Sequence, residues 1–143
     1  MSDPYKLQRF IEAQDEDFEA ALEELREGSK KSHWMWFVFP QLAGLGRSTT
    51  AQYFAVSSLD EARAYLDHPL LGPRLGQCLG ALLQWAGKRT AEEILGTIDA
   101  MKLRSSLTLF EAAAGDPSFA RALDAFFGGK RDDRTLALLN GGE

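Results

Sequence analysis

The chain has 143 residues, of which 45% are hydrophobic, and its formal net charge is −5 at pH 7. This length and hydrophobic content predict one globular domain over residues 1–143 and exclude an intrinsically disordered chain. The negative charge argues against a nucleic-acid polymer as partner, because proteins that bind one present a basic surface to its phosphates.

Three features predict the location of the protein. Cys78 is the single cysteine, which excludes an internal disulfide and is typical of a reducing compartment. Residues 1–27 are acidic and amphipathic, unlike a signal peptide. The longest purely apolar run, residues 34–39, is far too short to span a membrane. We therefore expect a cytoplasmic protein without membrane contact.

Between Asp3 and Gly28 the sequence predicts one helix, or two if the chain breaks near Gln14 and Asp15 caps the second. Asp3 and Pro4 are typical of an N-cap and a first helical position, apolar residues follow at helical spacing, and Gly28 ends the pattern. Residues 32–39 are ambiguous. They form either a buried strand, for which no partner strand is visible, or a short helical turn.

Capping residues and glycines predict the remaining helices. Ser58 with Glu61, and Thr90 with Glu93, have the spacing of a capping box, and Asp99 is expected to cap a helix over residues 100–114. Helix starts are predicted at Ser48 or Thr49, Ser58, Asp67–Pro69, Thr90, Asp99, Asp116, and Asp132 or Asp133. The pattern predicts a mainly α, compact bundle of seven or eight short helices with little or no β-sheet.

Residues 28–59 contain no acidic residue, although the chain has 21 in total. The segment holds cationic and aromatic residues: Lys30, Lys31, His33, Arg47, Trp34, Trp36, Phe37, Phe39, Tyr53 and Phe54. Such a segment suits an anionic ligand with a flat ring, because ammonium and guanidinium groups pair with phosphate and aromatic faces stack on a base. The alternative is that the rings form the core and the lysines are solvated. For Trp36 we expect burial.

The run from Gly44 to Thr49 is the sharpest local feature. Gly44 and Gly46 allow backbone N–H groups to converge, while Arg47 and Ser48 stand beside a predicted helix start, an arrangement that can bind phosphate. The run lacks the spacing of a Walker loop or a dinucleotide fingerprint. The alternative is a tight turn followed by an N-cap serine.

Proton-transfer candidates are few. His33, beside a tryptophan, can act as an acid or base near neutral pH. Asp99 and Lys102 are one helical turn apart, so they form either a surface ion pair or an acid and a cation facing one cleft. His68 precedes a proline and is more typical of a turn or cap. The two histidines have no carboxylate at ligand spacing, so no metal and no cofactor is predicted.

The run from His33 to Gln41, followed by Gly44 to Ser48, resembles the signature of the bacterial domain-of-unknown-function family 1810, some members of which carry the label calpastatin. The similarity continues from Leu7 to the C-terminal part of the chain. This resemblance implies a mainly helical single domain and no established activity. It also singles out polar residues that packing does not require: Lys30, His33, Gln41, Arg47, Ser48, His68, Arg74, Asp99, Lys102 and Asp132.

The layout is also similar, at the level of the fold, to the helical NADAR domains that act on ADP-ribose-type substrates. The acid-free aromatic segment that ends in the glycine loop leads us to predict a small protein whose pocket binds or processes a phosphorylated or nucleotide-derived, ADP-ribose-like ligand. The proton-transfer residues would be His33, Asp99 and Lys102. The ligand-binding residues would be Lys30, Trp34, Trp36, Gln41, Gly44, Gly46, Arg47, Ser48, Tyr53, His68 and Arg74. The alternative is a non-enzymatic helical interaction module whose polar residues form a structural network.

Overall fold

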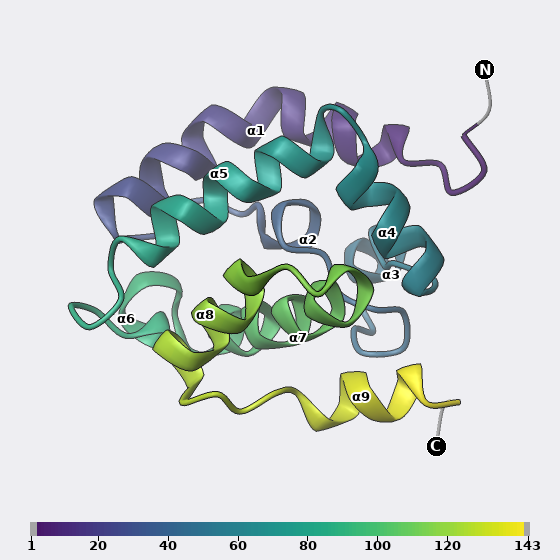
Figure 1. The fold of residues 1–143 in the computed structure, drawn as a ribbon. Helices are drawn as coiled ribbons and strands as arrows, with labels where there is room; N and C mark the ends of the chain where they lie inside the picture. The colour runs from purple at the N-terminus through teal and green to yellow at the C-terminus, as the bar shows by residue number, and fades with distance from the viewer. Residues whose placement is uncertain (1–2, 142–143) are drawn as a thin grey trace.

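The computed structural model describes residues 3–141, which contain nine helices (Figure 1). They are α1 (Gln8–Glu27), α2 (Met35–Val38), α3 (Thr49–Tyr53), α4 (Leu59–Asp67), α5 (Leu71–Leu83), α6 (Ala91–Leu95), α7 (Thr97–Ala114), α8 (Pro117–Phe127) and α9 (Asp133–Leu139). Strand-like pairing within these residues is limited to one parallel bridge between Leu42 and Val56. The prediction of a mainly α fold is confirmed. The ambiguous segment supplies an additional helix, α2.

Helix α7 lies at the centre of the molecule. It contacts α4, α6, α8 and α9, and nine of its residues are buried. A helix with apolar residues on several sides is typical of a core position. In Figure 1, α1 and α5 lie side by side along one side, α7 and α8 lie in the middle, and α9 runs along the opposite side. None of the helices within residues 3–141 combines the length and apolar character needed to cross a membrane.

Helix α1 starts later than Pro4. The carboxylate of Asp3 accepts hydrogen bonds from the backbone N–H groups of Leu7 at 2.8 Å and Gln8 at 3.1 Å. Asp3 therefore satisfies two donors at the helix start, as a cap does, but from a preceding turn. The helix is continuous up to Gly28, as the glycine predicts.

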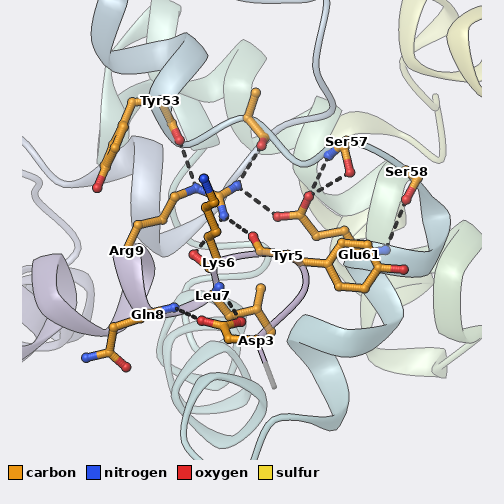
Figure 2. Close-up of polar contacts among 11 residues, drawn as sticks. Asp3, Tyr5, Lys6, Leu7, Gln8, Arg9, Tyr53, Ser57, Ser58 and Glu61 are labelled. Atoms are coloured by element: carbon orange, nitrogen blue, oxygen red, sulfur yellow. Dashed lines mark hydrogen bonds and ion pairs between the residues drawn. The ribbon is translucent and has the colours of Figure 1, made fainter. Parts of the chain in front are cut away.

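An ion pair between Arg9 and Glu61 joins the start of α1 to the start of α4 (Figure 2). The guanidinium Nη2 of Arg9 lies 2.8 Å from Oε2 of Glu61, and the two side chains are 12% and 3% exposed. The other Glu61 oxygen accepts from the backbone N–H and the hydroxyl of Ser57, at 2.9 and 2.8 Å. Both oxygens of this carboxylate are therefore used in contacts within the protein. The expected capping box is only half formed, because Ser58 accepts from the N–H of Glu61 while the Glu61 side chain turns to Ser57.

The remaining donors of Arg9 bind backbone carbonyls on two sides (Figure 2). Its Nε and Nη2 groups donate to the carbonyls of Tyr53 and Ala55, both at 2.8 Å. Its Nη1 group donates to Tyr5 and Lys6 at 2.5 and 2.9 Å. All five N–H donors of this planar side chain are thus used within the protein. Arg9 ties the segment before α4 to the N-terminal turn.

We expect Arg9→Met to lower the free energy of unfolding by about 3–5 kcal/mol, because it leaves a buried carboxylate without its charge partner. The matched control is Lys31→Gln, which removes an exposed pair with Glu27 whose side chains are 68% and 49% exposed. The control should cost about 1 kcal/mol or less. Urea denaturation at neutral pH measures both values. Equal losses in the two variants would contradict the structural role of Arg9.

Candidate functional site

The candidate site begins where the chain turns back after α1. Gly28 ends the helix with φ at 72°, in the left-handed region that glycine adopts without strain. A Cβ at this position would lie 2.6 Å from the ring of Trp85, so a larger residue does not fit. The chain after Gly28 therefore runs back past the last turns of α1.

The carboxylate of Glu24 fixes this returning segment. Its Oε1 accepts hydrogen bonds from the backbone N–H groups of Lys31 and Ser32 at 2.8 and 3.0 Å. The same oxygen accepts from the indole N–H of Trp34 at 2.9 Å, and Oε2 accepts from the Ser32 hydroxyl at 2.6 Å. Hydrogen bonds to an ionised acceptor are stronger than neutral ones. Together they hold the backbone of this segment and the Trp34 ring.

The environment of Glu24 favours its charged form. Partial burial would raise the pKa of this carboxyl, but the hydrogen bonds from Ser32, Lys31 and Trp34 outweigh it and lower the pKa from 4.5 to about 2. Each donor binds the ionised carboxylate better than the neutral acid. At neutral pH the anchor is therefore charged and accepts all of these bonds.

The opposite wall of the site is the start of α7. Gly96, with φ at 89°, is the N-cap residue, and no side chain caps the helix. The prediction that Asp99 caps a helix over residues 100–114 is wrong, because the helix already begins at Thr97. Asp99 instead lies in the first turn, where a negative charge is favourable, and its carboxylate is available for side-chain partners.

These two walls enclose a pocket of about 430 Å³, called the tryptophan pocket below. It contains the three predicted proton-transfer residues and three of the predicted ligand-binding residues. Its lining residues are Lys30, His33, Trp34, Met35, Trp36, Leu95, Gly96, Thr97, Ile98, Asp99 and Lys102. Asp99 and Lys102 thus satisfy both alternatives left open by the sequence, since they form an ion pair and also line one pocket.

The tryptophan pocket carries more positive than negative charge. Asp99 Oδ2 lies 2.9 Å from the ammonium group of Lys30, and its Oδ1 lies 3.5 Å from that of Lys102. Lys30 is the more buried of the two lysines, with a side chain that is 9% exposed against 24% for Lys102. One carboxylate therefore faces two ammonium groups. The closer pair neutralises Lys30, and Lys102 supplies the surplus positive charge.

Each lysine lies over an indole ring. The ammonium group of Lys30 is 5.4 Å from the ring centroid of Trp34, and that of Lys102 is 4.9 Å from the ring centroid of Trp36. These distances allow cation–π attraction. Trp34 is only 1% exposed and belongs to the core, whereas Trp36 is half-buried. The expectation that Trp36 is largely buried holds in part, since its ring packs against the core but is less buried than its neighbours Met35 and Phe37, which the helical turn of α2 directs inward.

His33 is exposed and makes no hydrogen bond to any described residue. It lines the tryptophan pocket, and its neighbours Ser32 and Trp34 are both fixed by Glu24. An imidazole with both nitrogens available can donate to an anion or transfer a proton.

A second hollow, called the adjoining pocket below, shares a wall with the first. It encloses about 310 Å³ and is lined by Gln41, Leu45, Gly46, Ile98, Met101, Lys102, Ser105, Asp132 and Arg134. Ile98 and Lys102 belong to both pockets. The predicted ligand-binding residues Gln41 and Gly46 therefore lie next to the predicted proton-transfer residues, on the other side of Lys102.

The glycines and the serine of the glycine loop, Gly44 to Ser48, are explained by the backbone conformation of the loop. Gly44 has φ at 103°, and a Cβ on Gly46 would lie 2.5 Å from that of Ala51. The hydroxyl of Ser48 accepts from the N–H of Ala51 at 3.0 Å and caps the five-residue helix α3. Arg47 is exposed and lines neither pocket. A role for this arginine in phosphate binding stays a prediction.

Three other predicted ligand-binding residues lie away from both pockets. Tyr53 is 58% exposed and lines a separate hollow near Arg9. The Nδ1 atom of His68 accepts from two N–H groups at the start of α5, as a cap does. Arg74 is 3.0 Å from Asp15 and 5.2 Å from the ring centroid of Phe18, so it joins α5 to α1.

Sequence reasoning missed two groups that build the site. In the sequence, Glu24 is one acid among several in the amphipathic segment of residues 1–27, although an acid one turn before a helix-ending glycine faces the N–H groups of the returning chain. Ile98 lies outside the helix predicted over residues 100–114, so the sequence does not place it at the site. Within the described residues, no cluster of three or more acidic, histidine or cysteine side chains could hold a metal ion.

The fold and the pocket define a small helical protein with a cationic, aromatic hollow beside its central helix. The chain belongs to the family described as "Protein of unknown function (DUF1810)", whose model matches residues 4–139. It is similar to the conserved hypothetical protein Rv1873 from Mycobacterium tuberculosis, with 50% sequence identity and a TM-score of 0.94 for its crystal structure over 96% of this chain and 99% of that chain. No curated protein matches the chain. The resemblance of the sequence to family 1810 is confirmed, and neither description names a ligand or an activity.

The two tryptophans should differ in their contribution to stability. We expect Trp34→Ala to lower the free energy of unfolding by about 3–5 kcal/mol, as for other fully buried large side chains. Trp36→Ala should cost about 1–2 kcal/mol, because its ring is only half-buried. Chemical denaturation of the two variants measures the difference. A larger loss for Trp36 than for Trp34 would contradict the described burial.

The low pKa of Glu24 predicts an acid-sensitive contribution to stability. Because the folded-state pKa of about 2 lies below the ordinary value of 4.5, this contribution is complete above about pH 4.5 and is lost as the pH falls toward 2. We expect Glu24→Gln to be less stable than the parent at pH 7, with a gap that narrows between pH 4.5 and 2. Urea denaturation across this range provides the test, and a gap that does not change with pH would contradict it. Other acids with lowered pKa values are present in both proteins, so their contributions cancel when the free energies of unfolding of the parent and the variant are compared.

Proposed function

We propose that this protein binds a small phosphorylated or nucleotide-derived ligand in the tryptophan pocket. The observation that carries the proposal is the convergence of Lys30, His33 and Lys102 with the half-buried ring of Trp36 on one open pocket. Ammonium and imidazole groups pair with phosphate oxygens, and an indole face stacks on a base. Each type of group that such a ligand requires is present.

The proposed roles follow from the charges. Lys102 holds the phosphate, because its pair with Asp99 is the longer of the two at 3.5 Å. His33 adds a second donor to the same anion and, in a reaction, transfers a proton. Asp99 holds the ammonium group of Lys30 in place through the shorter contact of 2.9 Å. Trp36 stacks on the ring of the ligand.

A non-enzymatic interaction module is the second candidate, and one observation favours it. Ile98 and Met101, one turn apart on α7, are 71% and 61% exposed, which is unusual for large apolar side chains. The polar contacts of Arg9 and Arg74 also match the structural network expected of a module. The tryptophan pocket supports the first candidate more strongly, because its polar residues face a common hollow.

We expect Lys102→Met to weaken binding of AMP by about 1.5–3 kcal/mol, the value of a charge-assisted hydrogen bond. Methionine keeps an unbranched apolar side chain next to Trp36 while removing the charge. The matched control is Lys130→Met, since Lys130 is exposed and lies in neither pocket. Isothermal titration calorimetry with AMP and with inorganic phosphate measures the affinities. A well-folded parent that binds neither at millimolar concentration would overturn the proposal.

The same titration distinguishes two placements of the phosphate. If the glycine loop holds it, Arg47→Ala weakens AMP binding and Lys102→Met does not. If the tryptophan pocket holds it, as proposed, the order is reversed. The control variant should bind like the parent in either case.

A further inference from the structure

Two adjacent pockets beside α7 differ in their chemistry. They share Ile98 and Lys102 as lining residues, so a ligand that extends past these side chains would contact both pockets. Their volumes of about 430 and 310 Å³ each lie at the small end of the range for ligand sites, about 300–1,000 Å³. An elongated ligand would occupy both pockets.

Aromatic rings are confined to the tryptophan pocket. Of the residues that line the adjoining pocket, none is aromatic, and four carry polar side chains besides Lys102: Gln41, Ser105, Asp132 and Arg134. A flat base has a stacking partner only at the Trp36 end. The other end offers amide, carboxylate and guanidinium groups, which suit a group rich in hydroxyls.

One oxygen of Asp132 accepts no hydrogen bond within the described residues, although it forms a long ion pair with Arg104. Its Oδ2 accepts from the N–H and the hydroxyl of Thr135, at 3.0 and 2.5 Å, and so caps α9. Its Oδ1 lies 3.8 Å from Nη2 of Arg104, too far for a hydrogen bond. The side chain of Asp132 is only 13% exposed. This oxygen can accept a hydrogen bond from a ligand hydroxyl without disturbing the cap.

Gln41 is fixed on the same pocket through its backbone. Its carbonyl accepts from the N–H of Val56 at 2.9 Å, next to the Leu42–Val56 bridge. Its side-chain amide makes no hydrogen bond to any described residue. Gln41 is half-buried, and its amide atoms are not among the buried side-chain atoms that lack a partner. The amide is therefore accessible and can pair with a ligand hydroxyl in the adjoining pocket.

We infer that the adjoining pocket is a hydroxyl-binding subsite, and that the ligand is a nucleoside diphosphate whose terminal phosphate carries a second sugar. The base lies on Trp36, the diphosphate crosses Lys102, and the second sugar donates to Asp132 and pairs with the amide of Gln41. This inference rests on the proposed function, because the tryptophan pocket must first bind the nucleotide part. Gln41 and Asp132 are then the residues that select for the sugar.

The test compares ADP with ADP-glucose, which differ by the second sugar. In calorimetric titrations the parent should bind ADP-glucose about tenfold more tightly than ADP, the effect of one or two additional hydrogen bonds. Gln41→Ala should remove most of this difference and leave the affinity for ADP unchanged. Gln77→Ala on α5 is the matched control, because Gln77 is exposed and lines neither pocket. Melting temperatures verify that both variants are folded.

The outcomes separate this inference from the proposed function. If the parent binds ADP and ADP-glucose equally, the subsite is refuted while the nucleotide pocket stands. If Gln41→Ala weakens both ligands to the same extent, Gln41 contacts their common part and the assignment of the sugar to the adjoining pocket is wrong. If neither ligand binds the folded parent, the proposed function fails and the inference fails with it.

Discussion

The carboxylate of Glu24 is the interaction on which the candidate site depends. It receives two backbone N–H groups, one hydroxyl and one indole N–H from the segment that follows α1. Without this carboxylate, the backbone N–H groups of Lys31 and Ser32 would lose their acceptor, and so would the indole N–H of Trp34. The segment, with its two lysines, would then no longer be held against α1. With the carboxylate in place, His33 and Lys30 are directed toward the start of α7. One partly buried glutamate therefore holds the chain that follows the helix in the position where it forms a wall of the pocket.

The second constraint is the early start of α7. Because the helix begins directly after Gly96, Asp99 reaches both lysines from its first turn. The site is thus assembled from the end of one helix and the beginning of another, and the central position of α7 holds the two together. The Arg9–Glu61 pair performs a similar joining role elsewhere, between α1 and α4, but all of its hydrogen-bonding groups are used internally. This contrast separates polar residues that stabilise the fold from those available to a ligand.

The sequence predicted the helical fold because apolar spacing, capping residues and helix-ending glycines are local signals, and Gly28, Ser48, Thr90 and Gly115 act as those signals indicate. It also singled out six of the seven polar and aromatic residues that line the tryptophan pocket, the exception being Thr97. It failed where distant segments decide the outcome. The partial exposure of Trp36 and the use of Arg74 between helices depend on which helices pack together, and no local pattern encodes that. The anchoring by Glu24 is local, since its partners lie 7 to 10 residues further along the chain, but it matches neither a capping signal nor the apolar spacing.

The most direct test of the account is an NMR titration of the isotopically labelled protein with AMP, performed in parallel on Glu24→Gln at neutral pH. In the parent protein we expect AMP to shift the indole signal of Trp36 and the backbone signals of Ile98 and Asp99. In the variant we expect the same signals to shift only at higher AMP concentration, since the segment that carries His33 is no longer held. Shifts confined to the Gly44–Ser48 loop, or identical titrations of the two proteins, would contradict it.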